Sequence, residues 1–143
     1  MRKNKESDSV AYAGYLIQVG NYRIPHSMIR AETYIVTKNG QDLDSYRDGD
    51  GKLHRTALEH WVAKAEFEVP ALKTNKEVAA FMGNIAANYT NAVEKKANVT
   101  LYTPEIDNYV TQEMYVPDIQ FTLYSATATE IKYNQFRVAF IGY

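Results

Sequence analysis

The spacing of apolar residues constrains this chain more than any other feature. In residues 64–69 the side chains of Ala65, Phe67 and Val69 alternate with charged side chains. An alternation with a period of two is typical of a strand that has one buried face. Only one stretch of the chain changes to the period of a helix, so a mainly β fold with a single helix is expected.

Runs of β-branched, aromatic and alternating residues, bounded by Gly, Pro or Asn, predict about seven or eight strands. Gly20-Asn21 supplies a tight turn between the first two. Packed as an antiparallel β-sandwich or barrel, or as one strongly bent sheet, the strands would bury their apolar faces. The expected strands are Tyr15–Val19, Tyr22–Ile24, Met28–Lys38, Leu53–Val69, Val99–Thr103, Tyr109–Val116, Ile119–Ser125 and Ile131–Ile141.

The one amphipathic helix is predicted at about residues 75–92. Thr74 and Glu77 have the spacing of a capping box, in which side chains satisfy the first free amides of a helix. The apolar residues that follow recur at helical spacing and form a single stripe, which suits packing on a sheet. That stripe consists of Val78, Phe81, Met82, Ile85, Ala86 and Tyr89.

Residues 39–53 are polar and rich in glycine, with few large apolar side chains. Such a segment buries too little to order itself, so it predicts a long projecting loop, or a hairpin with its tip at residues 48–51. Its aspartates do not fit a calcium-binding EF-hand: with Gly51 at the sixth position, Tyr46 and Ala57 occupy ligand positions. A solvated tip is expected, and irregular binding of a divalent ion stays open.

Composition narrows the class of protein. The formal net charge is −1, which argues against a general binder of nucleic acid. Cysteine is absent, which excludes disulfides and thiolate metal sites. Twelve tyrosines stand against five Phe and one Trp. Tyrosine suits surfaces that become buried against other proteins, although it also favours strands.

The residues that could carry chemistry form no recognisable set. His26, His54 and His60 lack the spacing of a metal site, and no nucleophile elbow or phosphate-binding loop occurs. We interpret Glu66 and Glu68 as part of a solvated strand face. We therefore expect no catalytic residue, no metal ligand and no cofactor.

The ends of the chain suggest a simple organisation. Residues 1–13 are expected to form a flexible N-terminal arm, and residues 14–143 a single β-sandwich domain with one helix. The polar start and the short apolar run 11–19 resemble neither a signal peptide nor a membrane span.

Three stretches in order carry a resemblance to a family. They are residues 45–55 (Ser-Tyr-Arg-Asp-Gly-Asp-Gly-Lys-Leu-His-Arg), residues 66–70 followed by the capped helix, and residues 114–118 with the C-terminal 131–134 and 140–143. Over about residues 14–143 the chain resembles small uncharacterised proteins encoded among the tail genes of phages and prophages of Gram-positive bacteria. Its layout is also similar to tail-tube and distal-tail proteins. The arm departs from that pattern, which leaves its role open.

The resemblance implies a structural, non-enzymatic component of a virion tail, made in the host cytoplasm. It would assemble as a homo-oligomeric ring, commonly hexameric, with other tail proteins. DNA would pass through the channel without sequence-specific binding, and no membrane would be involved. Residues 39–55 would correspond to the loop that reaches a neighbouring subunit: Asp42, Asp44, Tyr46, Arg47, Asp48, Asp50, Lys52 and Arg55. The aromatic residues expected at interfaces are Tyr34, Trp61, Tyr115, Tyr133 and Tyr143.

Two alternatives remain at this stage. A carbohydrate- or host-surface-binding module of the same particle would use Trp61 on an aromatic platform. An enzyme whose site assembles only in space would need a pocket with perturbed carboxylates or histidines.

Overall fold

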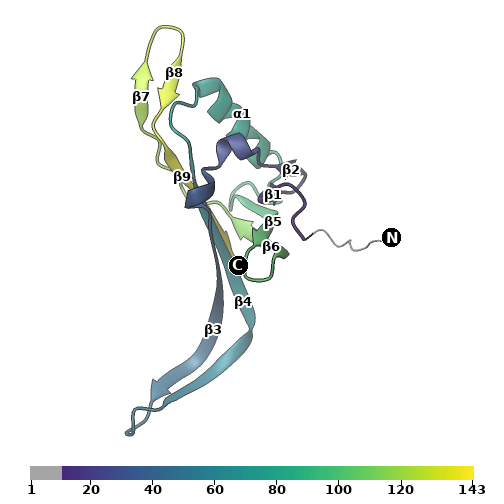
Figure 1. Ribbon diagram of the computed structural model, residues 1–143, viewed down its shortest axis with the longest axis vertical. Coiled ribbons are helices and arrows are strands. Elements are labelled where there is room, and N and C mark those ends of the chain that lie inside the picture. The colour runs from purple at the N-terminus through teal and green to yellow at the C-terminus, as the bar shows by residue number, and fades with distance from the viewer. Residues whose placement is uncertain (1–10) are drawn as a thin grey trace, which may run out of the picture.

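The computed structural model describes residues 11–143, without the side chains of residues 39–45 and 56–61. Nine strands, one α-helix and two short 3-10 helices occur within this described part (Figure 1). The strands are β1 (Ile17–Val19), β2 (Tyr22–Arg23), β3 (Ile35–Arg47), β4 (Leu53–Val69), β5 (Lys96–Thr103), β6 (Asn108–Tyr115), β7 (Leu123–Ala126), β8 (Ile131–Tyr133) and β9 (Phe136–Gly142). The helices are η1 (His26–Met28), η2 (Ala31–Thr33) and α1 (Asn75–Ala86).

Seven of these strands form one antiparallel sheet in the order β2-β1-β5-β6-β9-β4-β3. Strand β6 joins β9 at only two pairs, Met114 with Gly142 and Tyr115 with Ile141. A side chain at Gly142 would collide with Gln112 and with the main chain of Ala63, so this narrow joint needs glycine. Among the described strands, β2 and β3 each have one open edge, which gives a sandwich-like arrangement in place of a closed barrel.

The core lies between the faces of this sheet and α1. The predicted alternation in β4 is confirmed, because Ala65, Phe67 and Val69 are all buried. On β9 the side chains of Phe136, Val138 and Phe140 are buried in the same way. Burial of these apolar faces is the main force that holds the layers together.

Helix α1 begins where the sequence predicts. The Thr74 side chain accepts a hydrogen bond from the Glu77 amide, and the Glu77 carboxylate accepts one from the Thr74 amide. The stripe buries Val78, Phe81 and Ile85 against the sheet. The α-helix ends at Ala86, however, and residues beyond it form turns, so the prediction of a helix to residue 92 is wrong at its C-terminal end.

The longest strands form a hairpin that projects well beyond the body of the molecule (Figure 1). Residues 39–47 belong to β3 and pair with β4, so the prediction of a loop over 39–53 is wrong for most of its length. Only residues 48–52 form the turn. Main-chain hydrogen bonds between the two strands satisfy backbone amides and carbonyls. They order a segment that buries little apolar surface. The alternative prediction, a projecting hairpin with its tip at 48–51, is confirmed.

Several predicted strands have different bounds, and three of them differ in more than a few terminal residues. The segment 28–38 begins with the turns η1 and η2, and β3 starts only at Ile35. The segment 119–125 becomes a strand only from Leu123. The last strand is divided into β8 and β9 by residues 134–135, and β8 pairs with β7 in a separate two-stranded sheet. Overall, the predicted mainly β fold with one helix is confirmed.

Candidate functional site: the hairpin tip and the aromatic surface

The hairpin tip (residues 46–54) is held together by the carboxylate of Asp48. Its Oδ1 accepts hydrogen bonds from the amides of Asp50 and Lys52, each 3.0 Å long. Its Oδ2 lies 2.9 Å from Nε2 of His54 on the opposite strand. The Arg47 guanidinium donates to the Gly51 carbonyl over 2.9 Å. The tip is therefore a defined turn, in which Gly51 supplies the left-handed conformation that the turn requires (φ +83°).

These contacts also set the charge of the tip. The hydrogen bond from His54, followed by the one from the Lys52 amide, lowers the pKa of Asp48 below its ordinary value. The ring of His54 stacks on Tyr46 with 4.8 Å between ring centroids. Tyr46 is 59% exposed and Leu53 is 43% exposed. The tip thus presents an aromatic and aliphatic surface together with fixed charges.

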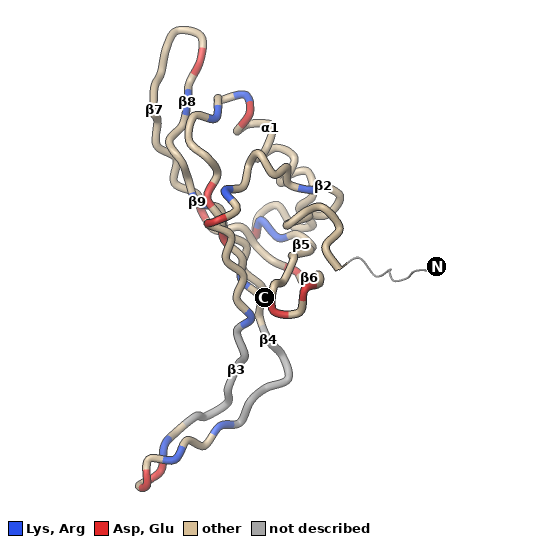
Figure 2. The backbone as a smooth tube through the Cα atoms, viewed as in Figure 1, with Lys and Arg blue, Asp and Glu red and all other residues tan. Residues whose placement is uncertain are grey.

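Most residues that the sequence assigned to a contact loop come together at this tip. Arg47, Asp48, Asp50 and Lys52 all lie there, exposed or partly exposed, and mix both signs of charge (Figure 2). Arg55 is exposed on β4 next to the tip. The side chains of Asp42, Asp44 and Trp61 lie outside the described residues.

Two of the predicted interface aromatics form a surface pair at the C-terminus. Tyr143 packs edge-on against Tyr115, with 5.6 Å between ring centroids. The hydroxyl of Tyr143 donates to the Glu94 carboxylate over 2.7 Å, and this bond raises the pKa of Tyr143 to about 12. The ammonium of Lys96 lies 4.9 Å from the centre of the same ring.

The other two described aromatics of that group lie closer to the core. Tyr34 is half-buried, and its hydroxyl donates to the Tyr102 carbonyl over 2.7 Å. Burial raises the pKa of Tyr34 well above its ordinary value. Tyr133 packs on the core and contacts Phe121, with 5.8 Å between ring centroids. These contacts give both residues a role inside the subunit, and their part in an interface stays a prediction.

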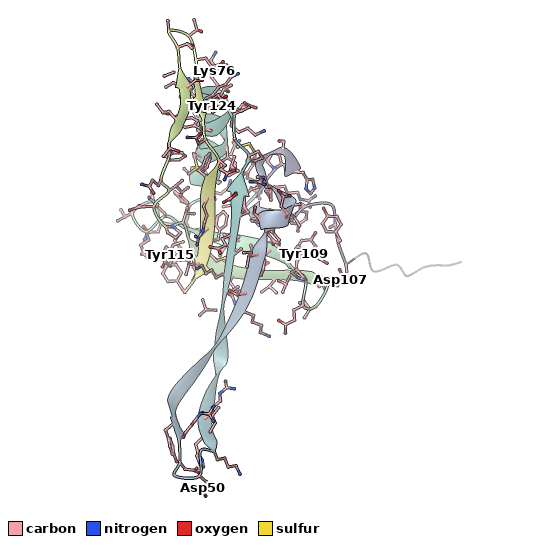
Figure 3. All side chains as sticks on the ribbon, turned by 60° about the vertical axis from the view of Figure 1, so that its left-hand side comes forward. Asp50, Lys76, Asp107, Tyr109, Tyr115 and Tyr124 are labelled. Carbon is pink, nitrogen blue, oxygen red and sulfur yellow. The ribbon has the colours of Figure 1, made fainter. Side chains whose placement is uncertain are left out.

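Sequence reasoning missed a tyrosine cluster beside the β5–β6 turn. Tyr15 stacks on Tyr109 at 4.6 Å, and Tyr12 meets Tyr102 edge-on at 5.5 Å. Tyr102 and Tyr109 face each other across the strand pair, next to Asp107 (Figure 3). The sequence did contain a signal for the pair Tyr102 and Tyr109. Residues at equal distances from a short turn lie opposite each other on the two strands that flank it. The guanidinium of Arg23 also lies over the Tyr15 ring, 4.3 Å from its centre.

The described residues show no group of three His, Asp or Glu side chains that could hold a metal ion. None of the helices in this part of the chain, α1 included, has the length and hydrophobicity needed to cross a membrane.

The fold and this surface together define a class: a mainly β protein built on an open antiparallel sheet, with one covering helix and a long projecting hairpin. The chain belongs to a family of unknown function, DUF6711, whose model matches residues 10–143. The prediction of an uncharacterised family is thus confirmed. No curated protein matches the chain.

Two solved structures are similar to this chain over nearly its whole length. One is a chain from the tail of an empty GTA particle, determined with C6 symmetry. It is 12% identical with a TM-score of 0.51, and the match covers 93% of this chain and 95% of that one. The other is a chain from the virion of a native gene transfer agent (GTA) particle. It is 15% identical with a TM-score of 0.48, and the match covers 93% and 96%.

Proposed function

We propose that this chain is a non-enzymatic structural subunit of the tail of a bacteriophage or phage-like particle. Copies assemble as a ring around a channel through which DNA passes. The observation that carries the proposal is the shared fold with a chain of a C6-symmetric tail, which extends over nearly the full length of both proteins. Six copies per ring is the stoichiometry that this symmetry suggests.

The open edges of the sheet support assembly. Strands β2 and β3 each have one side without a strand partner in the described residues. Exposed edges are normally paired or blocked, because their free amides and carbonyls recruit other strands. Strand β2 has only two residues, but β3 is long. Neighbouring copies that cover the β3 edge would turn this liability into an interface.

The projecting hairpin supports contact with a neighbour. Strands β3 and β4 extend the hairpin beyond the core, where its described tip packs only on itself. A well-ordered, exposed turn with Tyr46 and Leu53 at its surface has little to contribute to the stability of an isolated subunit. We assign it to binding an adjacent subunit or ring.

The balance of charge suits a channel wall. With a net charge of −1 the chain has no excess of cations to hold phosphate groups. Strong phosphate contacts would slow DNA that must slide through. The subunit would accordingly contact DNA only in transit, and its place would be in the virion.

Light scattering and electron microscopy of the purified protein test the proposal. Closed rings with a mass that is a fixed multiple of 16.3 kDa, or tubes of such rings, are expected. A monodisperse monomer at every concentration and ionic strength, alone and with co-expressed tail proteins, would contradict it.

A further inference from the structure

Strand β7 follows β6 on one side of an antiparallel pair of segments, and β8 and β9 form the other side. The pairing between the two sides is interrupted. Tyr115 pairs with Ile141, and further along Leu123 pairs with Tyr133. Leu123 lies eight residues after Tyr115, and Tyr133 lies eight residues before Ile141. Residues 116–122 and 134–140 would therefore pair in the register of a single antiparallel ladder if it were unbroken.

Pro117 and two contacts with Lys95 interrupt the pairing in this ladder. Pro117 would oppose Ala139, and it has no amide to donate. The preceding amide, that of Val116, donates to the Lys95 carbonyl over 3.1 Å. The ammonium of Lys95 also pairs with Asp118 at 3.0 Å. Together these contacts draw the segment away from β9.

The pairing resumes at Asn134. Its amide donates to the Thr122 carbonyl over 2.9 Å. Its side-chain amide donates to the Thr122 hydroxyl at 3.1 Å and to the Leu123 carbonyl at 3.2 Å. The opening thus has a fixed closure at each end, at Tyr115–Ile141 and at Thr122–Asn134.

A slot of about 520 Å³ lies between these two closures. We define the slot by its two walls, residues 116–121 and 135–140. Among the described residues no main-chain hydrogen bond links one wall to the other. Because strand residues direct their amides and carbonyls alternately to the two sides, about half of those on β9 face the slot. Polar side chains line it, including Asp118 and Gln120 on one wall and Gln135 and Arg137 on the other.

We propose that the slot receives an extended polypeptide segment, and that this segment is the N-terminal residues 1–10 of a second copy. The inserted segment completes the interrupted ladder by main-chain hydrogen bonds to one or both walls. The inference rests on the proposed function, since it names one contact between copies of the assembled subunit.

The closed ends of the slot favour a single extended segment as its occupant. A hairpin or the edge of a folded sheet is too broad to lie between two walls that rejoin at both ends. A single strand of six residues would span about 20 Å, and ten residues can span about 33 Å. The residues after β9 are already engaged, because Tyr143 donates its amide to the Glu113 carbonyl and its hydroxyl to Glu94.

The residues that follow this segment are anchored to β6 and η1. The Ala13 amide donates to the Tyr109 hydroxyl over 2.9 Å, and His26 bonds the Gly14 carbonyl at 2.8 Å. These anchors lie beside β5 and β6, whereas β8 and β9 lie on the other side of the body (Figure 1). Residues 1–10 carry both signs of charge, as the rim of the slot does.

Because the chain has no cysteine, disulfide trapping tests the insertion cleanly. Protein carrying Ser7→Cys is mixed with differently tagged protein carrying Gln120→Cys, a substitution at an exposed position on the slot wall. The matched control replaces Gln120→Cys by Ala80→Cys, which is exposed on α1. Under mild oxidation the first pair should form the mixed dimer at least about tenfold faster than the control, because insertion raises the effective thiol concentration.

Each outcome decides the question. Equal rates for both pairs, or no mixed dimer from Ser7→Cys and Gln120→Cys, overturn the insertion. If rings form by electron microscopy without that mixed dimer, only this inference fails and the proposed function stands. If neither rings nor the mixed dimer form, both fail.

Discussion

Shortening the hairpin separates its role in assembly from its role in folding. We consider a variant in which Tyr46–His54 is replaced by Asn-Gly, a pair that favours the tight turns of two-residue hairpins. The hydrogen bonds of the tip join tip residues to one another, so their removal takes no contact from the core. The hairpin becomes shorter by about 3.5 residues per strand, or about 12 Å.

The expected change in stability is small. The tip residues are exposed or partly exposed, and no residue of the buried core lies among them. A shorter connecting loop changes the free energy of loop closure by less than about 1 kcal/mol. The melting temperature should therefore shift by no more than about 3 °C. Assembly, in contrast, should be lost, since a contact partner would lie about 12 Å beyond reach.

Differential scanning calorimetry and light scattering measure the two effects on the same sample. Val93→Ser, at a residue that is 95% exposed and distant from the tip in sequence, is the control and should change neither. A fall in melting temperature of more than about 6 °C would show that the tip packs on the body. Rings of normal mass and stability would show that the tip is not a contact between subunits.

Three further predictions concern the body of the subunit. Phe81→Ala removes a buried ring of α1 and should cost about 3–5 kcal/mol in chemical denaturation; a loss below about 1 kcal/mol would mean that α1 does not cover the core. Thr74→Ala breaks the capping box with Glu77 and should cost about 1 kcal/mol in the same assay, so an unchanged midpoint would count against the cap. Burial raises the pKa of Tyr34, so the unfolded chain loses its proton first as the pH rises above about 10, and stability falls. In Tyr34→Phe this fall should be shallower by about 1.4 kcal/mol per pH unit, and an identical slope would refute the assignment.

The parts of the fold that local chemistry controls were predictable. The start of α1 follows from Thr74 and Glu77, which can only satisfy free amides at a helix terminus. The bounds of β4 agree with those expected, and the alternation at its end, over residues 64–69, has one stable arrangement on a sheet. The turn at Gly20 is likewise local, because glycine there takes the left-handed conformation that the turn requires (φ +58°).

Long-range pairing decided the parts that were missed. Residues 39–47 are too polar to predict a strand, yet they pair with the main chain of β4, with register shifts after Gly40 and after Leu43. Residues 119–122 alternate like a strand, but Lys95 holds the preceding residues away from β9. Both outcomes depend on partners that are distant in sequence, and no local pattern reports them.

The candidate site divides in the same way. The sequence alone determined that a polar, glycine-containing segment would project near residues 48–51, because it cannot bury enough apolar surface to pack inward. The tertiary structure decided that Asp48 and His54 close this tip into an ordered turn and that Tyr102 and Tyr109 gather Tyr12 and Tyr15. It also decided that the ladder between β6 and β9 opens into a slot. Sequence patterns describe which face of an element is apolar, whereas the register between elements is set only when their backbones pair.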